Sequence, residues 1–447
     1  MKKLISLLLS FALVLSVAYP FWSASVIEAD AAFDISFETT TKSLYLLNLD
    51  TNTVVYSKAS NEKRYPASTT KIMTYIIVAE HIDDFENTYV KVDGSILHML
   101  DGTGSSMAGI KADETLSIYQ LLCCLMIHSG NDAALILADY IGDGDISKFV
   151  DMMNAKAKEL GCKNTNFANP HGLHNENHYT TAEDMAIITQ YALTLPQFSE
   201  ITNTVVSDCL GDDRYLVTTN SMIDANRGGS YYYSYARGIK TGSTGTDSGY
   251  CLVSTAVRNG YTYLCVALGA PYEDEKGEQL DNGAMIDSKA LYQWAFANLE
   301  IKTILETSNL IKSIKLEYAW NKDTLQLVPA ENYSTILPSD INISSIDKTY
   351  DLPKSVEAPV QAGDKIGTVT LSYANQELVT IDLLAGETVE RSELLTALDG
   401  INSILQSQWF FLTIAALVLI FIIYLIAATL YNRAKKNKRP VKTYRKL

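Results

Sequence analysis

Two periods of hydrophobic positions occur along the chain, one typical of strands and one typical of helices. Residues 43–57 predict a hairpin, since two β-prone runs flank the turn residues 50–52. Pro66 is a start signal, and the apolar positions after it predict a helix from about Ser68 to His81. Further helices are predicted where apolar residues recur every three to four positions, over residues 116–127, 133–141, 145–160 and 181–195.

After Gly238 the pattern changes to strands. Residues 250–257 and 261–268 are apolar runs on either side of Asn259-Gly260, which is a strong hairpin turn. A helical pattern from about 284 to 298 follows them. Helices mixed with strands in this way predict an α/β (α+β) domain over residues 32–300.

The pattern changes again between about residues 302 and 389. Short β-prone runs such as 314–318 and 365–371 are separated by turn residues, and no long helical pattern occurs. This predicts a small all-β domain, a β-sandwich, over residues 301–392. Residues 393–408 are interpreted as a linker.

Two long apolar runs lie near the ends of the sequence. Two lysines, an apolar run and the small-residue site Ala29-Asp30-Ala31 predict a signal peptide over residues 1–31, although an uncleaved N-terminal anchor would show the same run. Residues 409–431 contain no charge and are long enough for a transmembrane helix. The tail, residues 432–447, has eight Lys or Arg and no acid, which places it in the cytoplasm and the rest outside the plasma membrane.

Charge and cysteine content restrict the possible functions further. The chain has a formal net charge of −15, although its last 39 residues, 409–447, contain eight Lys or Arg and no acid. The part predicted to lie outside the cell is therefore strongly acidic, which argues against nucleic acid as a partner. Six cysteines in an exported protein permit disulfides, but they are sparse and several lie in apolar runs, so buried free thiols are the favoured interpretation.

Ser68 and Lys71 form the first motif that suggests chemistry. Three residues apart on a helix, they share one face, so the Lys71 amine can reach the Ser68 hydroxyl. A serine is a poor nucleophile until a base takes its proton, and a lysine is a base only where burial or nearby cations favour its neutral form. Taken alone, S-x-x-K more often marks a capped helix with an exposed lysine.

Two further motifs follow along the chain. Ser129-Gly130-Asn131 lies in a break between two predicted helices, where Ser129 could relay a proton and Asn131 could hold a peptide carbonyl. Residues 240–244 precede a predicted strand: Lys240 supplies positive charge, Thr241 a hydroxyl for a carboxylate, and Gly242 room for a substrate backbone. Each motif alone fits a helix cap or a strand-edge turn, but the three in this order are the signature of penicillin-recognising serine acyl enzymes.

With these contexts the chain resembles the low-molecular-mass penicillin-binding proteins of the D-Ala-D-Ala carboxypeptidase family. The resemblance rests on residues 65–74, 128–134 and 238–244, together with Asn169-Pro170-His171-Gly172-Leu173 and the stretch 178–182. It implies a penicillin-binding, β-lactamase-like transpeptidase domain, followed by a small all-β domain and one C-terminal transmembrane helix.

The resemblance also implies roles for individual residues. Ser68 would attack the carbonyl between two terminal D-alanines, Lys71 would act as base, and Ser129 and Lys240 would help to protonate the departing D-alanine. Asn131, Thr241, Gly242 and Ser243 would bind substrate, with the oxyanion between the N–H groups of Ser68 and Ser243. The implied partners are peptidoglycan stem peptides, β-lactam inhibitors and the plasma membrane. No cofactor or metal is implied, and a protein partner of the β domain is not identified.

Two features differ from the family pattern, and three further functions compete with the one it implies. Arg237 stands where the family often has an acid, and residues 228–233 look like an insertion beside the site. A β-lactamase would need an E-x-x-L-N pattern, and Glu176 and Glu183 lie in the wrong context for it. An inactive wall-binding scaffold is the second competing function, and a zinc enzyme with ligands from His171, His174, Glu176 and His178 is the third. Carboxypeptidase and D,D-endopeptidase activity share one acyl-enzyme and cannot be separated by the motifs.

Overall fold

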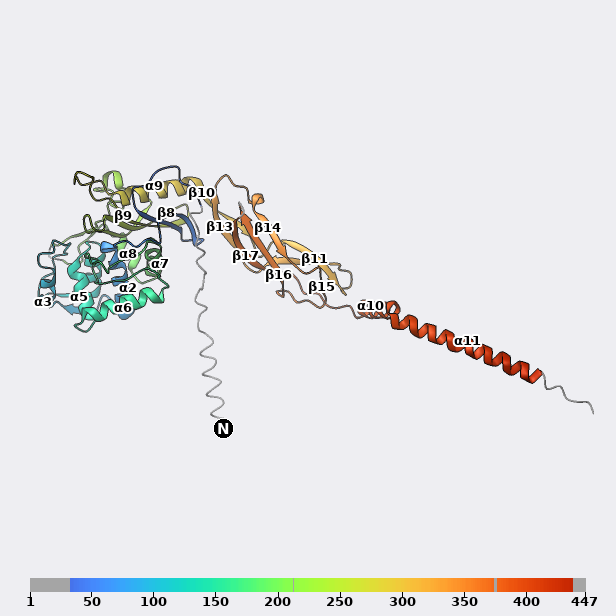
Figure 1. Ribbon diagram of the computed structural model, residues 1–447. Helices are drawn as coiled ribbons and strands as arrows, with labels where there is room; N and C mark the ends of the chain where they lie inside the picture. The colour runs from blue at the N-terminus through green and yellow to red at the C-terminus, as the bar shows by residue number, and fades with distance from the viewer. Residues whose placement is uncertain (1–32, 212, 374–375, 437–447) are drawn as a thin grey trace, which may run out of the picture. The chain divides into compact units, whose positions relative to one another are not determined.

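The computed structural model describes residues 33–436, except 212 and 374–375, so the predicted signal peptide and most of the basic tail lie outside the described residues. The chain divides into two compact units. The first ends at Ile301 and also holds Ile336–Ser339, and the second holds Lys302–Thr335 and the chain from Asp340 onward. Figure 1 gives the order of the elements along the chain.

A five-stranded antiparallel sheet forms the centre of the first unit. Its strand order is β2-β1-β9-β8-β7, so β7 is an edge strand. The predicted hairpins are confirmed at both places in the sequence. The strands are β1 (Ser43–Asn48), β2 (Thr53–Lys58), β7 (Ala236–Ser243), β8 (Tyr250–Arg258) and β9 (Tyr261–Ala270).

Helices cover both faces of this sheet, because alternate residues of its strands face two separate cores. Leu44 and Leu46 of β1 pack in a core with α9, whereas Tyr45 and Leu47 pack in the core formed by the other helices. Figure 1 shows α9 on one side of β9 and β8 and α2 on the other. The helices of this unit are α2 (Lys71–His81), α3 (Gly94–Leu97), α4 (Ile118–Met126), α5 (Asn131–Ile141), α6 (Ile146–Glu159), α7 (Ala182–Ala192), α8 (Phe198–Asn203) and α9 (Gly283–Asn298).

Short elements complete the first unit. Two small antiparallel pairs, β3 with β4 and β5 with β6, connect helices at its surface. These elements are β3 (Tyr89–Lys91), β4 (Thr115–Ser117), β5 (Val206–Ser207) and β6 (Leu216–Val217), with the 3-10 turns η2 (Ala67–Thr70), η3 (His98–Leu100) and η4 (Gly229–Tyr231). All six cysteines are free thiols, and four of them are buried.

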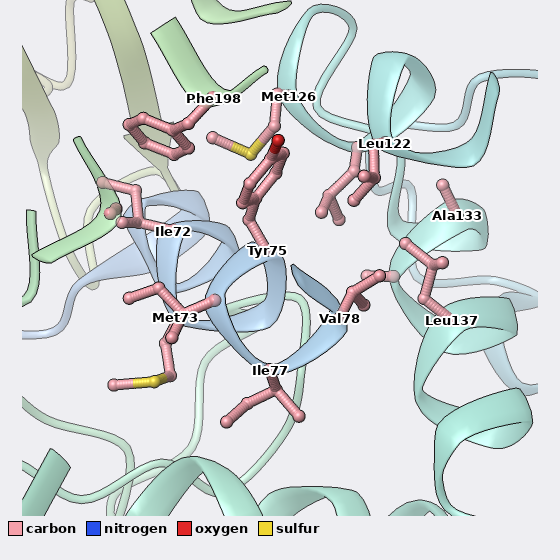
Figure 2. Packing of buried hydrophobic residues seen from close by; sticks show 14 of the residues in the cluster. Ile72, Met73, Tyr75, Ile77, Val78, Leu122, Met126, Ala133, Leu137 and Phe198 are labelled. Carbon is pink, nitrogen blue, oxygen red and sulfur yellow. The ribbon is translucent and has the colours of Figure 1, made fainter. Parts of the chain in front are cut away.

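Helix α2 is the central element of the larger core. All of its residues from Lys71 to Val78 are buried, so neighbouring elements surround it on every side. Figure 2 shows Tyr75 of α2 between Phe198 of α8 and the side chains of α4. The Tyr75 ring meets that of Phe198 edge to face at 4.9 Å, and its hydroxyl donates to the Pro196 carbonyl at 2.6 Å. This packing fixes the helix that carries Lys71 at its first position.

The second unit is built on strands, as the pattern after residue 302 predicts. Its main sheet has six strands in the order β14-β16-β17-β12-β11-β15, and β10 and β13 form a separate pair. The expected fold class, a penicillin-binding type α/β domain followed by an all-β domain, is confirmed. The strands are β10 (Leu299–Leu305), β11 (Lys312–Glu317), β12 (Thr324–Pro329), β13 (Tyr333–Pro338), β14 (Asp347–Asp351), β15 (Ser355–Glu357), β16 (Lys365–Tyr373) and β17 (Gln376–Ala385), with the turn η5 (Ile343–Ser345).

Most of residues 393–408, the stretch interpreted as a linker, are helical. They form helix α10 (Glu393–Gln406), which begins where the Ser392 hydroxyl caps the N–H of Leu395. Leu394, Leu398 and Ile401 recur at helical spacing, so the sequence does carry the pattern of this helix.

Helix α11 (Gln408–Lys436) follows after one residue and contains the whole predicted apolar run. Its most apolar window has a mean hydropathy of 3.0, and none of that window is buried. By length and composition this helix can cross a membrane.

Candidate active site

Ser68 lies in the 3-10 turn η2, one turn before α2, rather than in the α-helix itself. The residue before it, Ala67, has a φ of +47°, a left-handed conformation that is strained for a residue with a Cβ. The turn is closed by Thr69, whose N–H and hydroxyl both donate to the Pro66 carbonyl, at 3.2 and 2.7 Å. Ser68 is half-buried, so its hydroxyl is held at the surface of a rigid turn.

Lys71 is fully buried, and its amine touches three neutral groups. Its Nζ lies 3.0 Å from Ser68 Oγ, and it donates to Asn131 Oδ1 at 2.6 Å and to the His171 carbonyl at 2.8 Å. The last two partners can only accept hydrogen bonds. A neutral amine has two N–H groups and one lone pair, so these two acceptors use its protons and leave the lone pair facing the Ser68 hydroxyl.

Burial also favours the neutral form of this amine. Desolvation holds the pKa of Lys71 well below its ordinary value, the charge of Lys240 lowers it further, and Asp132 opposes the shift. Burial lowers the pKa of Lys240 itself to about 7. Burial and the repulsion between the two lysines thus both favour the neutral form of Lys71, which is the form that can act as a base.

Ser129 lies in the break between α4 and α5, as predicted, whereas Asn131 is the first residue of α5. Ser129 has a φ of +63° and is buried, and the N–H of the next residue, Gly130, donates to the Cys124 carbonyl at 2.9 Å. Asp132 fixes the same turn, because its carboxylate accepts from the backbone N–H groups of residues 108–110 at 3.0 to 3.2 Å. The turn therefore presents Asn131 to Lys71.

The Lys240–Ser243 motif lies within β7, not before a strand as expected. The strand that was predicted after the motif, residues 250–257, is β8, and it pairs with β7. Gly242 is packed against the catalytic turn: a Cβ there would lie 3.0 Å from the Ser68 nitrogen. Lys240 is buried and donates to the Thr241 carbonyl at 2.9 Å, and the Thr241 hydroxyl bonds that of Thr219.

The loop 169–178 contributes contacts that sequence reasoning missed. Gly172 has a φ of +90°, and a Cβ there would lie 1.9 Å from the Ala67 carbonyl oxygen. Its neighbour His171 holds Lys71 through its backbone carbonyl, not its ring. The resemblance marked this stretch of sequence, but a backbone contact across 100 residues leaves no signal of residue type.

Arg237 and residues 228–233 have other partners. Arg237 is exposed, and its guanidinium donates to the backbone carbonyls of Ser234 and Ala236 at 3.2 and 2.8 Å. Lys289 of α9 donates to the carbonyls of Ser230 and Tyr232, which fixes the insertion to that helix.

The histidines considered for zinc are engaged by protein groups. Both ring nitrogens of His178 have partners, in Thr70 and Ala168. The His171 Nδ1 accepts from the N–H of Leu173 at 3.2 Å, and the His174 ring packs edge to face on Tyr65. Within the part of the chain that the structure describes, no three His, Cys, Asp or Glu side chains come together as metal ligands.

Residues 28–272 match the family model of D-alanyl-D-alanine carboxypeptidases, which covers more than half of the chain. The chain belongs to this family. Residues 300–391 match a second model, the C-terminal domain of penicillin-binding protein 5. The two matches follow each other in the order that the resemblance implies.

Three relatives cover between 59% and 89% of the chain. The D-alanyl-D-alanine carboxypeptidase DacF of Bacillus subtilis is 30% identical over 404 residues, which is 89% of this chain and 97% of that protein. The crystal structure of penicillin-binding protein 5 from Haemophilus influenzae superposes with a TM-score of 0.63 at 26% identity, covering 80% of this chain and all of that one. The Streptomyces K15 DD-transpeptidase gives a TM-score of 0.52 at 27% identity over 59% of this chain and all of that one.

We predict that Gly172→Ala impairs the site more than its backbone strain alone would. Gly161→Ala is a matched control, because Gly161 has a φ of +89° and nothing within 4 Å of the added Cβ. In both variants the new alanine must adopt a left-handed conformation, which costs about 1–2 kcal/mol of stability. Only in Gly172→Ala must the added Cβ also displace the Ala67 carbonyl. We expect acylation by penicillin to slow at least about tenfold in Gly172→Ala alone. Equal rates in the two variants would contradict this account.

We predict that Lys240→Gln moves the acid limb of the acylation rate to higher pH. Lys71 accepts a proton only when neutral, so the rate falls as pH drops through its pKa. Removing the Lys240 charge removes a cause that lowers this pKa, so the pKa rises. The measurement is the acylation rate by penicillin against pH, with the exposed Lys111→Gln as control. A limb that stays in place or moves to lower pH would be the contrary result.

Proposed function

We propose that the chain is a serine D-Ala-D-Ala carboxypeptidase that removes the terminal D-alanine from peptidoglycan stem pentapeptides through an acyl-enzyme on Ser68. One observation carries the proposal: the fully buried Lys71 amine lies 3.0 Å from Ser68 Oγ while its other two partners are acceptors. This arrangement supports Lys71 as the base. The family to which the chain belongs supplies the substrate class.

In the acylation step the Ser68 hydroxyl gives its proton to the Lys71 lone pair, and Ser68 Oγ bonds to the carbonyl carbon of the penultimate D-alanine. The carbonyl oxygen becomes an oxyanion, which the N–H groups of Ser68 and Ser243 would stabilise. The close approach of Gly242 to the Ser68 nitrogen supports this pairing of turn and strand edge. Collapse of the intermediate breaks the peptide bond.

The leaving amine needs a proton, and Ser129 with Lys240 would supply it. Lys240, with a pKa of about 7, can hold and release a proton near neutral pH. Asn131, Thr241, Gly242 and Ser243 would bind the substrate peptide and its carboxylate. Water then cleaves the ester on Ser68, which releases the shortened peptide and restores the hydroxyl.

β-Lactams would acylate Ser68 by the same step, because their strained amide stands in for the peptide bond. We also propose the domain limits 32–300 and 301–392, which the two family matches and the two compact units support. The protein would be held in the plasma membrane by residues 409–431, with the catalytic domain outside and the basic tail in the cytoplasm. Helix α11 and the eight positive charges of the tail support this topology.

We predict that the purified protein releases free D-alanine from a synthetic peptide ending in D-Ala-D-Ala, and that Ser68→Ala abolishes the release. The substitution removes the nucleophile and leaves the core of α2 intact. Release is measured with a D-alanine assay, and circular dichroism checks that the variant folds. Equal release by wild type and variant would exclude Ser68 as nucleophile. A folded wild type that is labelled by penicillin but releases no D-alanine would indicate a different leaving group, as in an endopeptidase.

We predict that the chain ending at Ser407 leaves the membrane fraction, while the full-length chain stays there after an alkaline carbonate wash. The truncation removes the one helix in the described residues that is long and apolar enough to span a bilayer. In intact protoplasts, external protease should remove the catalytic domain and spare an epitope fused after Leu447. Digestion of the epitope would show that the tail lies outside the cell, which contradicts the proposed orientation. A truncated chain that stays in the membrane fraction would show that the anchor is not α11.

A further inference from the structure

A buried histidine that takes no part in the proposed chemistry touches the catalytic turn. His178 is 2% exposed and comes from the loop after α6. Its Nδ1 accepts from the Ala168 N–H at 2.9 Å, and its Nε2 lies 2.7 Å from the Thr70 hydroxyl. Thr70 stands between Ser68 and Lys71, so this contact joins the loop to the turn that carries the nucleophile.

Every proton in this chain of contacts can be assigned. The Ala168 N–H can only donate, so Nδ1 carries no proton and the neutral ring carries its proton on Nε2. Nε2 therefore donates to Thr70 Oγ1. The single Thr70 hydroxyl proton is donated to the Ala67 carbonyl, at 2.7 Å. Burial lowers the pKa of His178 to about 4, which keeps the ring in this neutral form.

The carbonyl at the end of the chain of contacts belongs to a strained residue. Ala67 has a φ of +47°, and a non-glycine residue keeps such a conformation only where its neighbours impose it. The peptide unit that begins with the Ala67 carbonyl ends with the Ser68 N–H, and the two groups point in opposite directions because the unit is planar and trans. Whatever orients this carbonyl therefore also orients the N–H proposed to stabilise the oxyanion.

We propose that His178 is a positioning residue for the acylation step: through Thr70 it fixes the Ala67 carbonyl and so aims the Ser68 N–H at the developing oxyanion. This inference rests on the proposed function, because it assigns a role within that reaction. His178 touches no substrate in this account. Its effect should fall on the rate of acylation at saturation, while the concentration of penicillin needed for half-saturation changes little.

Two substitutions separate this role from a purely structural one. In His178→Gln the amide nitrogen can replace Nε2 and donate to Thr70, while the Ala168 N–H loses its acceptor. In His178→Asn the amide oxygen can replace Nδ1 and accept from Ala168, while Thr70 loses its donor. Both variants remove the ring and one hydrogen bond, so a structural role predicts similar losses in both.

The test measures acylation of the full-length protein in detergent by a fluorescent penicillin, as rate against concentration. We expect His178→Asn to lower the saturating rate about tenfold or more and His178→Gln to retain most of it. Thr70→Val, which removes the same link, should slow the reaction as much as His178→Asn, and the double variant should lose no more than either. Equal rates for Gln and Asn, or additive losses in the double variant, would overturn the positioning role alone. A wild type that is never acylated would overturn the proposed function, and this role with it.

Discussion

The site depends on burying two lysines without giving them carboxylate hydrogen bonds. Removing an ammonium group from water is costly, so a buried lysine either gains a partner or loses its proton. Lys71 meets an amide oxygen, a backbone carbonyl and a hydroxyl, all of them neutral. The neutral amine satisfies all three contacts. The packing around Lys71 therefore favours the unprotonated form that the proposed base requires.

The rest of the first unit supplies the rigidity that this arrangement needs. Helix α2 is buried on every side, so Lys71 cannot move out to water without breaking the core. Asp132 holds the Asn131 turn through three backbone N–H groups, and Gly172 lets the loop carbonyl of His171 reach the lysine. The three motifs are therefore held by parts of the chain that lie far from one another in sequence.

Much of this could be predicted from sequence, because residue types at fixed spacing carry the signal. Each of the S-x-x-K, S-x-N and K-T-G motifs supplies a residue that lies at this site: Lys71 beside Ser68, Asn131 against Lys71, and Gly242 against the turn that carries Ser68. Backbone contacts carry no such signal, and so the roles of the His171 carbonyl, the left-handed Ala67 and the Thr70 hydroxyl were not foreseen. The K-T-G motif was placed before a strand because its polar side chains hide its membership of β7. The helix α10 was not predicted, although Leu394, Leu398 and Ile401 recur at helical spacing.

The central claim is that Ser68 forms the covalent intermediate, and mass spectrometry of the penicillin-treated protein tests it most directly. The account predicts one added penicillin per chain, on the peptide that contains Ser68, and no adduct when the protein is denatured beforehand. An adduct on another residue, or a folded protein that takes up no penicillin, would contradict it.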